Sequence, residues 1–244
     1  MSTIRCFTTD STKLISGTKH LLSQRESHHL VSVLRVRSSD SVLLMNGHGE
    51  IANTSICGRI GGLVELLIKT VTTCKRSRLV LCIGLLKNKA MDLVIRDAAA
   101  IGVAKILPLL TERTEVKFDQ KSAESKLLHW KAIAIEACKQ SGEAFLPEIL
   151  GPMGLETFLN GNKNISLVAG LYHHGEKYLI DYQSEIYDAH TLNLIVGPEG
   201  DFSPGEYEML LARGTKVITL TQNILRSETA ALYLLSLVDQ MVVR

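Results

Sequence analysis

Residues 194–206 read LIVGPEGDFSPGE, and this stretch decides the fold because it joins a buried strand to a capped helix. The loop GPEG at 197–200 follows the strand, and the sequence SPGE at 203–206 is a strong helix start. Ser203 can cap that helix, its proline suits the first turn, and Glu206 completes a capping box. In α/β proteins, ligands bind beside the loops at the carboxyl ends of strands. The stretch predicts a ligand loop, although the spacing alone also fits a tight turn with a solvated glutamate.

Strands and helices alternate on both sides of this stretch, from about residue 76 onward. Apolar runs of strand length occupy 79–85, 105–109, 165–171, 192–196 and 216–220. Helical patterns cover 89–101, 122–141, 203–214 and 227–243. Continuous apolar strands separated by helices predict an α/β domain with a mostly parallel sheet covered on both faces.

The N-terminal part of the chain has a different pattern. Short β-like pieces separated by glycine-rich turns lie at 41–45, 51–57 and 63–71. Residues 28–37 are consistent with one short helix. These features predict a small β-rich domain, a barrel, over residues 1–72, followed by the α/β domain over 73–244.

The composition is that of an ordinary globular protein. Of 244 residues, 45% are apolar and 21% are charged, which excludes a disordered tail, a coiled coil and a collagen-like fibre. The net charge of +2 neither indicates nor excludes nucleic-acid binding, because local patches matter more than totals. No apolar run reaches the roughly 18 residues of a membrane helix, and the N-terminus lacks an apolar signal stretch.

The chain lacks the motifs of several common enzyme classes. Its five cysteines are scattered without metal-ligand spacing, so we expect no zinc site and reduced thiols in a cytoplasmic protein. There is no G-x-G-x-x-G after a strand, no P-loop, no H-E-x-x-H and no G-x-S-x-G. Dinucleotide oxidoreductases, ATPases, zinc proteases and α/β hydrolases are therefore disfavoured.

A second ligand loop is predicted within 217–231, VITLTQNILRSETAA, where another strand leads through a loop into a helix. Arg226 lies at the helix start, where the helix dipole disfavours a cation, whereas Glu228 in the first turn is favoured. Ile224 and Leu225 are apolar loop residues that suit the wall of an adenine pocket. The alternative interpretation is that both apolar residues belong to the core and that the arginine is a surface charge.

Positive charges cluster between residues 75 and 89, where five basic residues occur without an acidic one. They are Lys75, Arg76, Arg78, Lys87 and Lys89. The cluster brackets the first strand of the α/β domain and is the best local candidate for contacts with phosphate groups. A solvated surface fits the same residues.

In chain order, the motifs HHL-x-x-VLR, T-E-R, W-x-x-I-x-x-E-A-C-x-Q-S-G, LIVGPEG and ILRSETA resemble the RsmE-type methyltransferases of small-subunit ribosomal RNA. The resemblance runs from about residue 20 to the C-terminus. It implies a PUA-like β-barrel over 1–72 and, over 73–244, a SPOUT α/β domain with a C-terminal trefoil knot. It also implies a homodimer that binds S-adenosylmethionine in the knot, without a metal, and methylates N3 of a uridine in 16S rRNA.

The resemblance assigns roles to residues of the predicted loops. The residues implied in cofactor binding are Ala169, Gly170, Leu171, Val196, Gly197, Gly200, Leu220 and Leu225. Arg226, Glu199 and Glu228 are implied in the chemistry. Either carboxylate can take the N3 proton, and the arginine can stabilise negative charge on the uridine. Arg35 of the VLR motif and the basic cluster are implied in RNA binding.

The chain departs from the family pattern near the expected RNA surface. A second glycine usually follows GPEG, and here the residue is Asp201. Thr221 and Asn223 stand in the place of a glycine and an arginine, and Glu143 and Phe145 stand where arginines are usual. Two further hypotheses therefore stay open: a ribosome-binding assembly factor that has lost catalysis, and a SPOUT methyltransferase that acts on transfer RNA.

Overall fold

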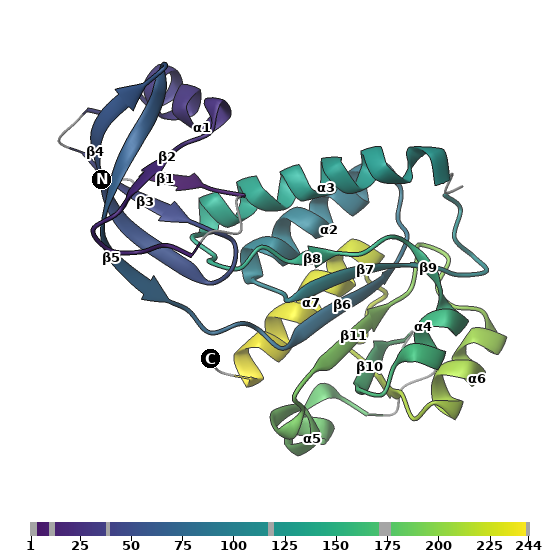
Figure 1. The fold of residues 1–244 in the computed structure, drawn as a ribbon. Coiled ribbons are helices and arrows are strands. Elements are labelled where there is room, and N and C mark those ends of the chain that lie inside the picture. The colour runs from purple at the N-terminus through teal and green to yellow at the C-terminus, as the bar shows by residue number, and fades with distance from the viewer. Residues whose placement is uncertain (1–3, 10–12, 38–39, 117–119, 171–176, 243–244) are drawn as a thin grey trace. The chain divides into compact units, whose positions relative to one another are not determined.

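The computed structural model describes residues 4–9, 13–37, 40–116, 120–170 and 177–242. The chain divides into two compact units, which Figure 1 draws as ribbons. Unit 1 comprises Met1–Arg76 together with Ile135–Leu146, and unit 2 comprises Ser77–Ala134 together with Pro147–Arg244. The segment Ile135–Leu146, which the sequence prediction placed with the second domain, packs with the N-terminal unit.

Unit 1 is built on a five-stranded sheet in the order β1-β3-β4-β5-β2. The strands are β1 (Ile4–Phe7), β2 (Lys19–Leu21), β3 (Ser41–Met45), β4 (Glu50–Ile60) and β5 (Leu63–Thr73). β1 pairs with β3 in parallel, and the other pairs are antiparallel. The three strands predicted from the sequence are confirmed as β3, β4 and β5. In the turn between β3 and β4, the side-chain oxygen of Asn46 accepts hydrogen bonds from the backbone N–H groups of His48 and Glu50.

The helix predicted over 28–37 lies earlier in the structure. α1 spans Gln24–His28 and continues into a π-helical turn, η1 (His29–Val33). The side chain of Ser23 caps the first turn of α1 and so sets the earlier start. Arg35 adopts a left-handed φ of 53°, which a continuing helix does not allow.

Unit 2 is an α/β domain in which every described strand pair is parallel. The strand order is β12-β10-β11-β6-β7-β8, and β9 also pairs with β7. The strands are β6 (Leu79–Gly84), β7 (Lys105–Leu110), β8 (Glu148–Ile149), β9 (Met153–Gly154), β10 (Ile165–Ala169), β11 (Leu192–Val196) and β12 (Lys216–Ile218). The helices are α2 (Asn88–Ile101), α4 (Leu155–Gly161), the 3-10 turn η2 (Leu179–Tyr182), α5 (Gln183–Asp188), α6 (Pro204–Ala212) and α7 (Ser227–Met241). α3 (Gln120–Ser141) begins in unit 2, and its residues from Ile135 onward belong to unit 1.

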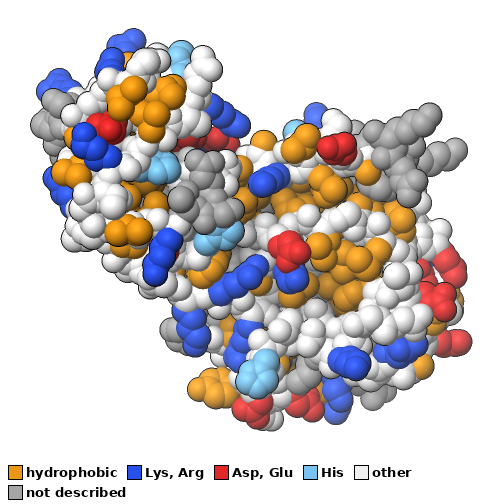
Figure 2. Space-filling model, viewed as in Figure 1, with side chains coloured by type: hydrophobic (Ala, Val, Ile, Leu, Met, Phe, Trp, Pro, Cys, Tyr) orange, Lys and Arg blue, Asp and Glu red, His pale blue; other side chains and the backbone are white. Residues whose placement is uncertain are grey.

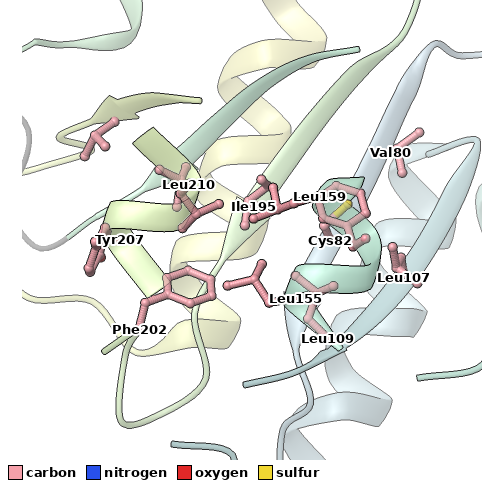
Figure 3. Close-up of a cluster of buried hydrophobic side chains, with 13 residues drawn as sticks. Val80, Cys82, Leu107, Leu109, Leu155, Leu159, Ile195, Phe202, Tyr207 and Leu210 are labelled. Carbon is pink, nitrogen blue, oxygen red and sulfur yellow. The ribbon is translucent and has the colours of Figure 1, made fainter. Parts of the chain in front are cut away.

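Helices cover both faces of this sheet, as the apolar strand pattern predicted. On one face, alternate side chains of β6, β7, β10, β11 and β12 pack against α4, α6 and Phe202 (Figure 3). On the other face, α7 contacts β6 and β11, and α2 packs on α7 (Figure 1). Every residue of β6 and β11 is buried for this reason, which explains why neither strand alternates apolar and polar residues.

Several element ends agree with the sequence, and others differ. Gly102 ends α2 with a left-handed φ of 94°, as predicted. β12 ends at Ile218 rather than at residue 220, and α6 ends at Ala212 rather than at residue 214. β12 ends early because the residues that follow it, from Leu220, form a loop that lines the pocket described below. The short elements α4, α5, η2, β8 and β9 were not predicted, since a helix or strand of a few residues carries little periodicity.

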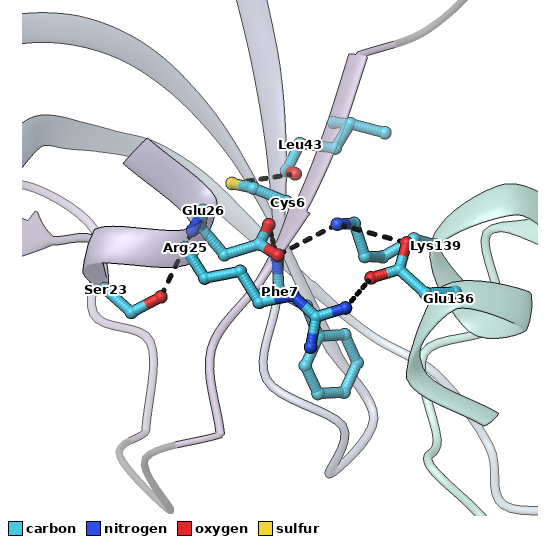
Figure 4. Close-up of polar contacts among 8 residues, drawn as sticks. All are labelled: Cys6, Phe7, Ser23, Arg25, Glu26, Leu43, Glu136 and Lys139. Atoms are coloured by element: carbon cyan, nitrogen blue, oxygen red, sulfur yellow. Dashed lines mark hydrogen bonds and ion pairs between the residues drawn. The ribbon is translucent and has the colours of Figure 1, made fainter. Parts of the chain in front are cut away.

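A buried ion pair joins distant segments within unit 1 (Figure 4). Lys139 Nζ lies 2.8 Å from Glu26 Oε1, and both side chains are 7% exposed. The other carboxylate oxygen of Glu26 accepts a hydrogen bond from the backbone N–H of Phe7 at 3.1 Å. Beside it, Arg25 pairs with Glu136 at 2.9 Å. These contacts fix the end of α3 to α1 and β1.

Candidate functional site

A pocket of about 860 Å³ lies in unit 2, where loops follow the carboxyl ends of β10, β11 and β12. Its volume is in the range of sites that hold small molecules. Most residues predicted for cofactor binding and chemistry line it: Ala169, Gly170, Val196, Gly197, Glu199, Leu220, Leu225, Arg226 and Glu228. Gly200 is not part of the lining, and Leu171 lies outside the described residues.

At three glycines at this edge of the sheet, neighbouring atoms already occupy the place that a side chain would take. A Cβ atom on Gly84, the last residue of β6, would lie 2.3 Å from the backbone nitrogen of Pro198. One on Gly197 would lie 2.9 Å from Asp201 Oδ1, and one on Gly170 would lie 3.0 Å from a side-chain carbon of β12. These glycines therefore allow neighbouring segments to pack closely at this edge of the sheet, and Gly170 and Gly197 also line the pocket. The sequence analysis missed Gly84, although a glycine that ends an otherwise apolar strand was the available signal.

Glu199 connects the GPEG loop to the start of α2. Its Oε1 accepts a hydrogen bond from the backbone N–H of Lys87 at 3.2 Å, and Lys87 is the N-cap residue of α2. A carboxylate is favoured there by the helix dipole. The side chain of Lys87 is paired with Glu115 at 2.6 Å, and this hydrogen bond raises the pKa of Lys87. Lys87 therefore stays positively charged at neutral pH.

Arg226 is the N-cap residue of α7, and its exposed side chain lines the pocket. It makes no capping hydrogen bond, and we find no ion-pair partner for it among the residues that the structure describes. Glu228 follows in the first turn of α7 and is half-buried. In the preceding loop, Thr221 Oγ1 accepts a hydrogen bond from the backbone N–H of Asn223 at 2.8 Å. The cation at this helix start is thus available to a ligand.

Asp201, one of the residues that depart from the family pattern, adopts a left-handed φ of 60°. That region favours glycine. The hydroxyl of Tyr207 donates a hydrogen bond to the carboxylate and lies 3.0 Å from both of its oxygens. Tyr207 is 5% exposed, and its ring packs edge-on against Phe202 with centroids 5.6 Å apart. A buried tyrosine therefore fixes the carboxylate at the pocket wall.

The buried carboxylate of Glu206 confirms the predicted capping box and also binds the backbone of the T-E-R motif. Its Oε2 accepts a hydrogen bond from the backbone N–H of Ser203 at 2.9 Å, and its Oε1 accepts one from the backbone N–H of Glu112, also at 2.9 Å. Arg113 Nη1 donates to the carbonyl oxygen of Gly200 at 3.0 Å. The T-E-R motif therefore supports the GPEG loop from outside the pocket.

The predicted basic residues are divided between the two units. Arg35, Lys75 and Arg76 are exposed in unit 1, where the Arg76 guanidinium lies 6.0 Å from the ring centroid of Phe145. Arg78 belongs to unit 2 and donates to two backbone carbonyls at 2.8 and 2.7 Å, which gives it a structural task. The last two, Lys87 and Lys89, are exposed and line the pocket.

The described part of the chain holds no group of three or more His, Cys, Asp or Glu side chains arranged for a metal ion. None of its described helices is both long enough and apolar enough to cross a membrane. None of the five cysteines forms a disulfide, and burial raises the pKa of Cys6, Cys82 and Cys138.

The pocket lies at the carboxyl ends of parallel strands and is lined by glycines of three loops. This arrangement is typical of an α/β domain that binds a small molecule at that edge of its sheet. Residues 73–239 match the family model described as an RNA methyltransferase domain, and residues 22–56 match the model of an RNA methyltransferase PUA domain. The chain therefore belongs to the RNA methyltransferase family that these models define.

Individual relatives agree with this assignment. Ribosomal RNA small subunit methyltransferase E of Rickettsia conorii is 31% identical, over 87% of this chain and 85% of the relative. A methyltransferase from Legionella pneumophila, solved with the cofactor SAM, is 30% identical with a TM-score of 0.87 and covers 98% of both chains. Ribosomal RNA small subunit methyltransferase E from Neisseria gonorrhoeae, bound to S-adenosylmethionine, is 25% identical with the same TM-score and coverage.

The close approach at Gly84 generates a prediction about ligand binding. Gly84→Ala places a methyl group against the backbone of Pro198, so the GPEG loop must move. We expect affinity for S-adenosylmethionine, the ligand of both solved relatives, to fall at least about tenfold, the scale of an overpacking cost of 1–3 kcal/mol. Calorimetric titration measures this. Gly151→Ala is the matched control, because a Cβ there meets nothing within 4 Å, and equal affinities of the two variants would contradict the prediction.

Proposed function

We propose that the chain transfers a methyl group from S-adenosylmethionine to N3 of a uridine in the 16S rRNA of the small ribosomal subunit. The observation that carries this proposal is the glycine-lined pocket, formed by the loops that the family motifs occupy. The relatives named small-subunit rRNA methyltransferases support the substrate class, and the two solved relatives support the cofactor. The uridine and its N3 atom come from the resemblance to the RsmE-type enzymes. A ribosomal substrate places the proposed reaction in the cytoplasm.

The residues of the pocket fit this cofactor. Gly170 and Gly197 are among the residues that line the pocket, where their backbone groups can contact a nucleoside or an amino-acid tail. Leu220, Ile224 and Leu225 supply apolar side chains that suit an adenine ring. When bound, S-adenosylmethionine supplies a methyl group on a positively charged sulfur, which needs no metal for activation.

The chain's own residues then have two tasks besides placing the reacting atoms. The N3 proton of uridine must leave, and Glu199 and Glu228 are the carboxylates that can accept it; such help is worth roughly 10²–10⁴-fold. Arg226, which lacks an ion-pair partner among the described residues, can stabilise negative charge on O2 or O4 of the uridine.

We expect Arg226→Ala to lower turnover on the order of 10²-fold, the effect of losing one charge-stabilising donor. Cofactor affinity should change little, and thermal stability should stay level or rise slightly, because a cation at a helix N-terminus is mildly unfavourable. The assay is transfer of labelled methyl from S-adenosylmethionine to small ribosomal subunits from cells without the gene, with mass spectrometry of the product. Arg96→Ala, on the exposed part of α2 away from the pocket, is the control.

The same assay separates the three functional hypotheses. Labelling of 16S rRNA at a uridine supports the proposal. Binding of subunits and of cofactor without any transfer supports the assembly factor, and labelling of transfer RNA supports the third hypothesis. Unchanged turnover of Arg226→Ala, or a loss fully explained by unfolding, rejects the role of Arg226.

We also propose that unit 1 is a PUA-like barrel that holds RNA through its exposed cations. On the face seen in Figure 2, Lys and Arg side chains are spread over unit 1 more widely than acidic ones. The triple variant Arg35→Ala, Lys75→Ala, Arg76→Ala should bind subunits more weakly, with the slope of log affinity against log salt reduced by roughly 0.7–0.9 for each lost phosphate contact. Cofactor affinity should not change. Lys105→Ala is the control, since Lys105 is a half-buried lysine of β7 paired with Glu148. An unaltered slope in the triple variant would contradict the role of these cations.

A homodimer with the C-terminal knot of SPOUT enzymes is the proposed assembly. Apolar residues in the final helix are a candidate for part of an interface, but Ala230, Ala231, Leu234, Leu235 and Val238 of α7 are buried within the chain, and Met241 is half-buried. The interface must therefore use exposed side chains nearby, and Ile224 and Tyr233 are 72% and 42% exposed. Light scattering should give a mass twice that of the single chain, which is 26.8 kDa. Tyr233→Asp should lower the measured mass toward that of the monomer. A monomer at micromolar concentration is the opposing result.

A further inference from the structure

The ring of Phe145 lies at a junction of three segments of unit 1. The segments are the turn between β3 and β4, the chain that follows β5, and the chain that follows α3 and carries Phe145. The backbone N–H of Gly49, in the turn, donates a hydrogen bond to the carbonyl oxygen of Ala144 at 3.1 Å. The backbone N–H of Leu146 donates one to the carbonyl oxygen of Gly47 at 2.9 Å. Because these hydrogen bonds lie on either side of Phe145 in the chain, the backbone that carries the ring is fixed to the turn.

Gly49 allows the turn to approach the ring of Phe145 closely. Its φ of 96° lies in the left-handed region that favours glycine. A Cβ atom at this position would lie within 2.8 Å of three ring atoms of Phe145. The backbone N–H of Phe145 also donates a hydrogen bond to Glu143 Oε1 at 3.1 Å. The ring is therefore held in one place.

A guanidinium from a distant part of the sequence lies over this ring. The backbone N–H of Cys74 donates a hydrogen bond to the carbonyl oxygen of Gly49 at 2.7 Å, which fixes the chain after β5 to the same turn. Two residues further on, Cζ of Arg76 lies 6.0 Å from the ring centroid of Phe145. At such a distance the face of an aromatic ring attracts a cation. Arg76 is exposed and Phe145 is half-buried, so the ring supports a cation at the surface.

This arrangement puts a positive charge beside a position at which the chain lacks the charge of the family pattern. Phe145 stands where an arginine is usual, and Arg76 belongs to the basic cluster that is predicted to contact phosphate groups. A guanidinium is planar and can bind a phosphate group through two parallel hydrogen bonds. When a ring orders the guanidinium in advance, less conformational entropy is lost on binding. The guanidinium on Phe145 is therefore suited to a phosphate group of RNA.

We propose that Phe145 is a positioning residue for RNA binding: its ring holds Arg76 so that the guanidinium binds a phosphate group of the rRNA. The inference rests on the proposed function, in which Arg76 is one of the cations that hold RNA. Phe145 acts through Arg76 and takes no part in methyl transfer. Loss of the ring therefore weakens RNA binding and leaves the cofactor pocket, which belongs to unit 2, unaffected.

The test is a double-mutant cycle on the full chain, read out as affinity for small ribosomal subunits from cells without the gene, at low salt. Phe145→Leu keeps an apolar side chain and removes the ring, so affinity should fall about two- to fivefold, the value of an exposed cation–π contact. In a chain that already carries Arg76→Ala, the same change should have no further effect, because residues in contact are not additive. Lys75→Ala gives the matched control cycle: its effect and that of Phe145→Leu should add, because the ring contact belongs to Arg76.

Two conservative variants separate positioning from a purely structural role. Phe145→Tyr keeps the ring and should bind subunits as the unmodified chain does. Arg76→Lys changes the exposed partner and loses the planar guanidinium, so it should weaken binding by about the same factor as Phe145→Leu. Arg76→Lys decides the outcome if Phe145→Leu does not fold.

The inference is overturned if the effects of Phe145→Leu and Arg76→Ala add, if Phe145→Tyr binds as weakly as Phe145→Leu, or if Arg76→Lys binds as the unmodified chain does. In each of these cases cofactor binding and methyl transfer to subunits by the unmodified chain leave the proposed function standing. If the unmodified chain does not bind small subunits, both the inference and the proposed function fail.

Discussion

The pocket depends on the close approach of two backbone segments, the end of β6 at Gly84 and the GPEG loop at Pro198. A single Cβ on Gly84 would lie 2.3 Å from the backbone nitrogen of Pro198, so nothing larger than hydrogen fits between them. This approach holds the GPEG loop against the edge of the sheet. From there Glu199 reaches the backbone of Lys87 at the start of α2. Parallel strands end at the same edge, which is why one constraint organises several loops.

The loops around the pocket are fixed from outside by groups that do not line it. Glu206 is 2% exposed and bonds to the backbone of both Ser203 and Glu112, and Arg113 bonds to the carbonyl of Gly200. In unit 1, the buried pair of Glu26 and Lys139 does the same for the end of α3. Rigid support of this kind orients a site before its ligand arrives, which lowers the cost of binding.

Much of the fold and most of the pocket could be predicted from the sequence because the signals are local. The apolar runs of β6 and β11 predicted a parallel sheet buried on both faces. The capping box of Ser203 and Glu206 and the left-handed Gly102 were readable because a cap involves residues a few positions apart. Arg226 and Glu228 line the pocket as the motif order predicted. The short elements and the early helix at Gln24–His28 could not be predicted, since a few residues show too little hydrophobic periodicity.

The sequence by itself therefore determined the order of the longer strands and helices, the loops that carry ligand residues, and the family. Only the tertiary structure decided which single residues do what, because those contacts join residues far apart in the chain. Lys139 meets Glu26 across 113 positions, and Arg78 is occupied by backbone carbonyls more than 100 positions away. The position of Asp201 is decided in the same way: folding brings its carboxylate to the hydroxyl of Tyr207 and against Gly197 at the pocket.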